Sequence, residues 1–283
     1  MSNVLSPEEI AQFERDGYLS PVRGLSDAEV RHYRDCLENF ERKHPEHLKK
    51  LKSKSHLLCP WVVEMAEHPH LLDIFEDLVG PDILCWSMAW RIKSAESKTF
   101  AGWHQDSAYF SVQPILVFGA LALSDCGTDA GCLRVIPGSH KWPLLPHQDT
   151  EDPDSILARG QYISADFDRS AAVDLALKPG EIALINHAIV HSSTPNQSRD
   201  RRILLLVEMM PTKARDPNHR GSAMLVRGVD RYRNFEEDPR PDAELSPQAL
   251  ANWKRMMEFR AKQIFDGSKL LPSEAYGGTR PAT

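Results

Sequence analysis

Long apolar runs are absent from this sequence. None approaches the roughly 20 residues that a membrane-spanning helix requires, so we expect no membrane segment. An export signal is absent as well, because residues 1–19 carry acidic side chains where such a signal needs basic residues followed by an apolar stretch. These two absences predict a protein that stays in the cytoplasm.

The sequence also has few cysteines and no excess of basic residues. The five cysteines are odd in number and form no Cys-x-x-Cys pair, which favours reduced thiols over a disulfide framework. Lysine and arginine number 34 against 40 aspartates and glutamates, for a net charge of −6, so no basic footprint for nucleic acid is present. We therefore expect a small-molecule partner, and the oligomeric state stays open.

The N-terminal part, about residues 1–80, has the pattern of helices. Ser6 and Ser26 each stand three residues before a glutamate, Glu9 and Glu29, which is the spacing of a capping box at a helix start. The chain contains no internal repeat, and its 283 residues fit a single domain with extensions. We therefore predict one domain that spans the whole chain.

From residue 83 onward the pattern becomes that of strands. Between Ile83 and Lys93, large apolar residues alternate with smaller or polar ones, which is the period-two pattern of a strand. Further candidate strands, separated by Gly, Pro and Asp turns, are Ile115–Leu123, Cys132–Ile136, Glu181–Asn186 and Arg202–Met210. Many short strands joined by turns predict a sandwich or barrel over about residues 82–212.

Three segments have no such periodicity. The lysine-rich stretch 49–54 is interpreted as a solvated turn. The acidic stretch of about 141–170 is long enough to form a lid or a disordered excursion. Residues 213–270 read as a C-terminal loop followed by a helix, which Ser246 caps.

His104 and Asp106 are candidate metal ligands. An iron(II) site for oxygen chemistry uses two imidazoles and one carboxylate on one face of the metal. A strand projects residues i and i+2 to the same side, so His104 and Asp106 can both face a barrel interior. The tripeptide is frequent by chance, however, and His147-Gln148-Asp149 repeats it.

Sequence context favours the first copy. His147 lies among prolines and acidic residues, in a stretch predicted to be an exposed loop that cannot hold ligands rigidly, whereas His104 has apolar and aromatic neighbours. The second histidine ligand has two candidates, His187 and His191. Both would face the same side of a strand, so periodicity leaves this choice open.

Several motifs are spread over most of the chain. They are Trp103-His104-Gln105-Asp106, Gly131-Cys132-Leu133 with Pro137-Gly138-Ser139-His140, and His191-x-Ser193-x-x-Asn196-x-Ser198 followed by Arg202. Together they resemble the phytanoyl-CoA dioxygenase family of iron(II)- and 2-oxoglutarate-dependent oxygenases. The resemblance implies a mainly β fold, the double-stranded β-helix or jelly roll, with N- and C-terminal helices packed on one sheet.

The resemblance also implies the residues of the site. In that family the distal histidine begins the His-x-Ser-x-x-Asn stretch, which selects His191. An arginine eleven positions later, Arg202, would bind the far carboxylate of 2-oxoglutarate, and Ser193 would add a hydrogen bond. His104, Asp106 and His191 would hold iron(II), with 2-oxoglutarate and O₂ as co-substrates. Asp106 disfavours halogenation, since related halogenases carry Gly or Ala at that position.

The pattern of the last strand supports Arg202 independently. Arg202 shares one face of the strand with Glu208, while Arg201 would lie outside the interior. The opposite face is wholly apolar and consists of Ile203, Leu205, Val207 and Met209. A planar guanidinium is suited to binding a buried carboxylate in two places at once.

The substrate is indicated only by class. We predict hydroxylation of an aliphatic C–H bond of a small polar metabolite, with aminophosphonates and quaternary-amine zwitterions as candidates. Residues that could contact it are Tyr109, Arg91, Lys93, Glu208, Arg227 and Asp230. Two alternatives are a cupin-like metalloenzyme that does not use 2-oxoglutarate and a jelly-roll binding protein without activity. Neither needs an arginine in the position of Arg202.

Overall fold

A computed structural model describes residues 4–278. The α-helices are α1 (Pro7–Asp16), α2 (Asp27–Lys43), α3 (Pro60–Ala66), α4 (Pro69–Val79) and α5 (Pro247–Phe265). The 3₁₀ helices are η1 (Pro45–Lys52), η2 (Ser55–Leu57), η3 (Asp106–Ala108), η4 (Ser139–Lys141) and η5 (Glu274–Tyr276). The strands are β1 (Tyr18–Arg23), β2 (Ile83–Lys93), β3 (Ala101–His104), β4 (Val117–Ala122), β5 (Leu133–Val135), β6 (His147–Gln148), β7 (Tyr162–Ile163), β8 (Val173–Leu175), β9 (Glu181–Asn186), β10 (His191–Ser193), β11 (Arg202–Pro211), β12 (Ser222–Arg227) and β13 (Glu236–Glu237).

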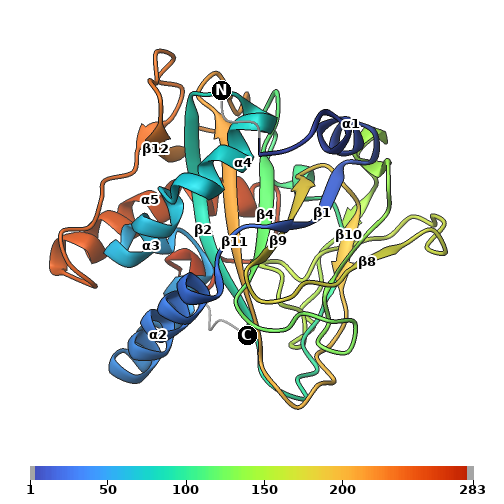
Figure 1. Ribbon diagram of the computed structural model, residues 1–283, viewed down its shortest axis with the longest axis horizontal. Coiled ribbons are helices and arrows are strands. Elements are labelled where there is room, and N and C mark those ends of the chain that lie inside the picture. Colours follow the sequence, from blue (N-terminus) through green and yellow to red (C-terminus); the bar gives the residue numbers. More distant parts are fainter. Residues whose placement is uncertain (1–3, 279–283) are drawn as a thin grey trace.

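The strands form a jelly roll of two unequal sheets. The larger sheet has seven strands in the order β1-β9-β4-β11-β2-β12-β13, and the smaller has four in the order β3-β10-β5-β8. Strands β6 and β7 make a separate two-stranded pair. Figure 1 shows α3, α4 and α5 gathered beside β2 and β12, with β8 and β10 on the far side of the large sheet. The predicted mainly β fold with flanking helices is confirmed.

Helix α4 covers the outer face of the large sheet. The apolar face of β11 that carries Leu205 and Val207 is fully buried. Gly119 of β4 pairs with Val207 and lies directly under the helix, since a Cβ atom at Gly119 would stand 2.8 Å from the ring of Phe75. This close approach seals the outer face with apolar contacts. The polar residues of β11 consequently face the interior of the jelly roll.

The N-terminal part contains a strand that the helical pattern did not predict. Both predicted capping boxes are present, with the Ser6 and Ser26 hydroxyls accepting from the backbone N–H groups of Glu9 and Glu29. Between these two helices, however, β1 pairs antiparallel with β9 at the edge of the large sheet. A six-residue edge strand depends on that distant partner, so its own residues carry little signal.

The lysine-rich stretch is not a wholly solvated turn. Lys54 is only 1 % exposed, and its ammonium group donates to Asp238 at 2.6 Å and to the Trp86 carbonyl at 2.8 Å. Asp238 lies in a segment that was predicted to be irregular, so no local pattern indicates the pairing. A buried cation of this kind needs such a partner, because desolvation penalises an unpaired charge.

The irregular segments pack against the barrel. The stretch that follows β6 is anchored beside β3, since the Phe100 N–H donates to the Asp154 carbonyl and the Ile156 N–H donates to the Phe100 carbonyl, each at 2.9 Å. It is thus an ordered cover, as one of the two interpretations of 141–170 predicted. The C-terminal loop contributes β12 to the large sheet, which was not predicted, and Ser246 caps α5 as expected. Across residues 4–278, no helix has the length and apolar content that spanning a membrane requires.

Candidate metal centre and its cavity

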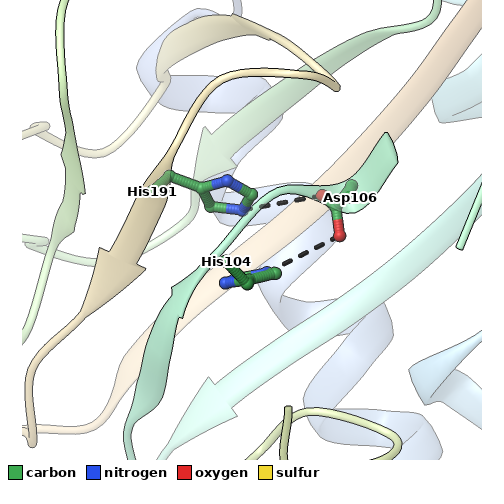
Figure 2. Close-up of side chains that lie close together, drawn as sticks. All are labelled: His104, Asp106 and His191. Carbon is green, nitrogen blue, oxygen red and sulfur yellow. Dashed lines mark ion pairs between the residues drawn. The ribbon is translucent and has the colours of Figure 1, made fainter. Parts of the chain in front are cut away.

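Three side chains from the small sheet and its loop converge on one point (Figure 2). His104 ends β3, Asp106 begins η3, and His191 begins β10, where it stands directly opposite His104 in the antiparallel register. The Nε2 atoms of His104 and His191 lie 3.6 and 3.5 Å from the two Asp106 carboxylate oxygens. All three ligand atoms lie within 4.8 Å of one another, and no other such group of three occurs in residues 4–278.

The two histidines present the nitrogen that a metal would need. The Nδ1 atom of His104 donates to the Gly102 carbonyl at 2.8 Å, and that of His191 donates to the Ile189 carbonyl at 3.0 Å. These partners assign the proton to Nδ1 and leave the Nε2 lone pair free, which is how backbone carbonyls orient metal-binding imidazoles. Burial lowers the pKa of His191 to about 4, so the ring is neutral at neutral pH. The donor set therefore fits a divalent metal.

His187 is not part of this group. It precedes β10, is 8 % exposed, and its backbone N–H donates to the Leu116 carbonyl at 3.1 Å. Its Nδ1 atom is buried without a hydrogen-bond partner in the described residues. The geometry therefore agrees with the choice of His191 over His187.

The second His-x-Asp tripeptide, His147-Gln148-Asp149, lies apart from the metal group and has a structural role. His147 is not in an exposed loop: it lies in β6, half-buried behind the metal group. Its Nδ1 donates to the Leu145 carbonyl at 2.7 Å, and its Nε2 accepts from the Gln105 backbone N–H at 3.0 Å. Both ring nitrogens are thus engaged. Asp149 forms an ion pair with Arg159 at 2.8 Å. The second tripeptide therefore stabilises the segment between His104 and Asp106 through His147 and does not form a metal site.

Arg202 and Ser193 mark a basic end of the cavity that lies against the metal group. Arg202 is 1 % exposed and donates only to backbone carbonyls, at 2.6 Å to Gly131 and 3.3 Å to Arg91. Within the described residues no acidic side chain pairs with it, and its Nε atom has no partner. A buried guanidinium without a counter-ion indicates that an anion is the missing partner.

Lys93 belongs to the same basic end. It faces Arg202 across the β2–β11 pair, and its Nζ donates to the Ser193 hydroxyl at 2.9 Å and to the Thr194 carbonyl. Burial, together with the nearby charge of Arg202, lowers the pKa of Lys93 to about 7. Its predicted contact with the substrate is therefore replaced by a contact with Ser193, because the side chain points to the Arg202 end.

The cavity brings together some of the predicted substrate residues and leaves others outside. Its wall includes the three residues of the metal group together with Arg202 and Ser193. The predicted substrate residues Arg91, Tyr109 and Glu208 also line it. Arg227 and Asp230 do not reach it. Arg227 pairs with Asp73 and Glu76, each at 2.7 Å, and the Asp230 carboxylate accepts from backbone N–H groups of its own loop. Strand β2 separates β12, which ends at Arg227, from β11, and Asp230 lies in the loop that follows β12.

Sequence reasoning missed Arg260, which lines the cavity from α5. This arginine is 4 % exposed and donates to Glu208 at 3.0 Å. A signal was present in the sequence: Arg260 interrupts the apolar stripe of α5, whose buried members include Trp253, Met257 and Ile264. A charged residue in a buried stripe of this kind marks a polar partner in the core.

Comparisons with known proteins agree with this geometry. The family model "Phytanoyl-CoA dioxygenase (PhyH)" matches residues 13–204. L-proline trans-4-hydroxylase from Streptomyces griseoviridis is 27 % identical over 224 residues, which cover 69 % of this chain and 83 % of that protein. The solved structure of the non-heme monooxygenase ThoJ is 29 % identical, covers 90 % of this chain and 96 % of that one, and has a TM-score of 0.80. The structure of CytC3 with Fe(II) and alpha-ketoglutarate covers 86 % of this chain and 97 % of that one, at 22 % identity and a TM-score of 0.63, and shares the fold.

Proposed function

Because the chain belongs to the phytanoyl-CoA dioxygenase family, it is an iron(II)- and 2-oxoglutarate-dependent dioxygenase, and we propose that His104, Asp106 and His191 hold its iron. The observation that carries this proposal is the convergence of two unprotonated Nε2 atoms and one carboxylate within 4.8 Å. Two imidazoles and a carboxylate are the ligand set of non-heme iron(II) oxygenases. Bound iron(II) with 2-oxoglutarate and O₂ supplies the oxidant, and one C–H bond becomes C–OH as succinate and CO₂ form.

Arg202 and Ser193 are the proposed anchor for the distal carboxylate of 2-oxoglutarate. The guanidinium of Arg202 is buried without a counter-ion, so a carboxylate there gains a charge-assisted hydrogen bond and relieves the unpaired charge. Ser193 accepts from Lys93 and can donate its own hydroxyl proton to the same carboxylate. The two cations and the hydroxyl thus orient one end of the co-substrate.

Lys93→Met should weaken the binding of 2-oxoglutarate about 10-fold, roughly 1.4 kcal/mol, without changing the affinity for iron. Since the pKa of Lys93 is lowered to about 7, a bound dianion favours the protonated amine. In the wild type the dissociation constant for 2-oxoglutarate should therefore rise as pH increases above about 7. Calorimetric titration of the zinc-loaded protein between pH 6 and 9, as an order-of-magnitude window around that value, measures this dependence.

The Lys93→Met variant should show a flat profile over the same pH range. Lys98→Met, on the loop that follows β2, is the matched control and should behave as the wild type. A pH dependence that survives in Lys93→Met would assign it to another group and remove Lys93 from the anchor.

The proposed reaction is hydroxylation of an aliphatic C–H bond in a small polar metabolite. The cavity joins charged side chains, Arg91 and Glu208, to the apolar Leu204 and Leu206. L-proline, named as the substrate of the related hydroxylase, is a small zwitterion of that kind. The cover from residues 156–161 and the C-terminal segment also line this cavity, and they exclude water from the reacting bond.

Substrate-dependent succinate formation tests this reaction. We expect that one or more small zwitterions will raise succinate release from iron-loaded protein with 2-oxoglutarate and O₂, and that each succinate will be matched by one hydroxylated product. Succinate formation without oxygen incorporation into any member of the series would contradict hydroxylation.

A further inference from the structure

Away from the metal group, two side-chain oxygen atoms in the cavity wall lack a hydrogen-bond partner within residues 4–278. Glu208 is 2 % exposed, and only its Oε2 atom receives a hydrogen bond, from Arg260; within residues 4–278 its other oxygen has none. The hydroxyl of Tyr109 is likewise buried and without a partner in this part of the chain. Both residues line the cavity that contains the metal group. Buried polar atoms are almost always satisfied in folded proteins, so the pair indicates a ligand that donates hydrogen bonds to them.

Arg260 holds the Glu208 carboxylate and has this acid as its counter-ion. Its guanidinium carbon lies 4.0 Å from the ring centre of Trp86 and 4.3 Å from that of Phe110, so the group packs against two aromatic rings. Its Nη2 atom donates to Glu208 at 3.0 Å, while its Nε and Nη1 atoms have no hydrogen-bond partner in the described residues. Cation–π contacts and one ion pair account for its charge. The free oxygen of Glu208 is therefore fixed in place, with its acceptor lone pairs toward the cavity.

Glu208 lies far from the co-substrate end. It shares the inner face of β11 with Arg202, six residues away, which corresponds to about 20 Å along a strand. That separation exceeds the length of a five-carbon diacid. Leu204 and Leu206 form the apolar wall between them. The Glu208 end is thus available to a second molecule, the substrate.

Arg91 provides a cation at the edge of the same cavity. It lies on β2, opposite Leu204 of β11, and donates to the carbonyls of Lys52 and Trp90. Within residues 4–278, no acidic side chain forms an ion pair with it. Arg91 also lines the neighbouring pocket that opens between η1 and the cover over residues 150–160. An oxyanion at the cavity mouth would meet an uncompensated guanidinium.

We propose that the substrate is a zwitterion with a protonated primary or secondary amine, which donates to Glu208 and Tyr109, and with an oxyanion that pairs with Arg91. This inference rests on the proposed function, because it assigns the substrate of that same site. A quaternary amine has no N–H to donate and would leave both acceptors unsatisfied. The carbon skeleton between the two charges then lies along Leu204 and Leu206, where the C–H bond is oxidised.

The test compares amines that differ only at nitrogen. The probes are 2-aminoethylphosphonate, L-proline and 5-aminopentanoate, each with its N-acetyl and its fully N-methylated counterpart. Binding is measured by calorimetry to zinc-loaded protein saturated with 2-oxoglutarate. At least one free amine should bind, and at least 10-fold more tightly than both of its counterparts.

Variants separate the charges. Glu208→Gln should weaken the bound amine about 100-fold, in line with the loss of a buried charge-assisted hydrogen bond. Because that change leaves Arg260 unpaired, Tyr109→Phe provides a second variant, which removes only an unpartnered hydroxyl and should weaken the amine about 5-fold with the fold intact. Arg91→Ala should weaken it about 10-fold, whereas Arg227→Ala, a surface control, should have no effect.

Three results would overturn the inference. The first is tighter binding of the acetylated or quaternary compounds than of the free amines, and the second is that no free amine in the panel binds. The third is an equal affinity for the amine in the wild type and in both the Glu208 and Tyr109 variants. All variants should still bind 2-oxoglutarate without an amine. If the wild type itself does not bind 2-oxoglutarate, the proposed function is wrong. Failure of the proposed function is thus distinguishable from failure of the substrate assignment.

Discussion

Replacing His191 with alanine should remove stoichiometric iron(II) from the protein, whereas replacing His187 should leave iron bound. His191 places a free Nε2 atom 3.5 Å from Asp106, opposite His104 in the register, while His187 lies outside the group of three. Loss of one of three protein ligands leaves a bidentate site, and we expect its affinity to fall by at least about 100-fold. His104→Ala and Asp106→Ala should behave in the same way.

Anaerobic titration with iron(II), followed by removal of free metal and iron quantification, measures this difference. His147→Ala is a second control. It loses the Nε2 atom that accepts from the Gln105 N–H, which should cost about 1–3 kcal/mol of stability but leave the metal bound. Retention of iron in His191→Ala with its loss in His187→Ala would show that the wrong histidine was assigned. Loss of iron in His147→Ala alone would point to the other tripeptide.

Arg202→Ala should weaken 2-oxoglutarate binding by at least about 30-fold, because a buried charge-assisted contact with a carboxylate contributes about 2–5 kcal/mol. Iron affinity should be unchanged, since Arg202 contacts only carbonyls in the described residues. The variant should remain folded, because removal of a buried cation that lacks a counter-ion relieves a desolvation cost. Arg202→Lys should restore part of the affinity, as a point charge without the planar fork.

The neighbouring arginine is a matched control for this variant. Arg201 lies outside the interior, as the strand pattern predicted. It forms an ion pair with Glu41 at 2.9 Å. Arg201→Ala should therefore bind 2-oxoglutarate with wild-type affinity in the same calorimetric titration. Equal losses in both variants would mean that bulk charge, and not a specific anchor, governs co-substrate binding.

Local patterns were informative where the chain is regular over many residues. The predicted strand Ile83–Lys93 agrees with β2, and the predicted strand Glu181–Asn186 agrees with β9. Both are buried strands with strong apolar content and turn residues at their ends. Helix α5 begins after the predicted cap at Ser246 and ends at Phe265. In these segments the residues themselves carry the signal.

Elements that depend on distant partners were not predictable in this way. Strand β1 exists because β9 is beside it, and β12 because β2 is, although each lies in a segment with helical or irregular character. Lys54 is buried because Asp238, 184 positions later, meets it in the core. Such pairings arise from tertiary packing, which overrides local propensity.

In the candidate site, too, residues placed by local periodicity were predictable, whereas residues placed by tertiary contacts were not. The row of inward residues on β11 followed from period two, and the structure places Arg202 and Glu208 in the cavity wall. Arg260 reaches that wall from α5, and Lys93 turns toward Ser193, through contacts between elements far apart in the chain. Arg227 was predicted to reach the substrate, but its ion pairs with Asp73 and Glu76 hold it outside the cavity.

Anaerobic titration of the iron(II) protein with 2-oxoglutarate tests both the metal centre and the co-substrate, because the chelated co-substrate gives a weak visible charge-transfer band. We expect the band to appear in the wild type and to saturate at one equivalent per iron. The same titration should give no band in His191→Ala and should need at least about 30-fold more 2-oxoglutarate in Arg202→Ala. A wild-type protein that binds iron but develops no band would show that 2-oxoglutarate does not chelate this metal centre.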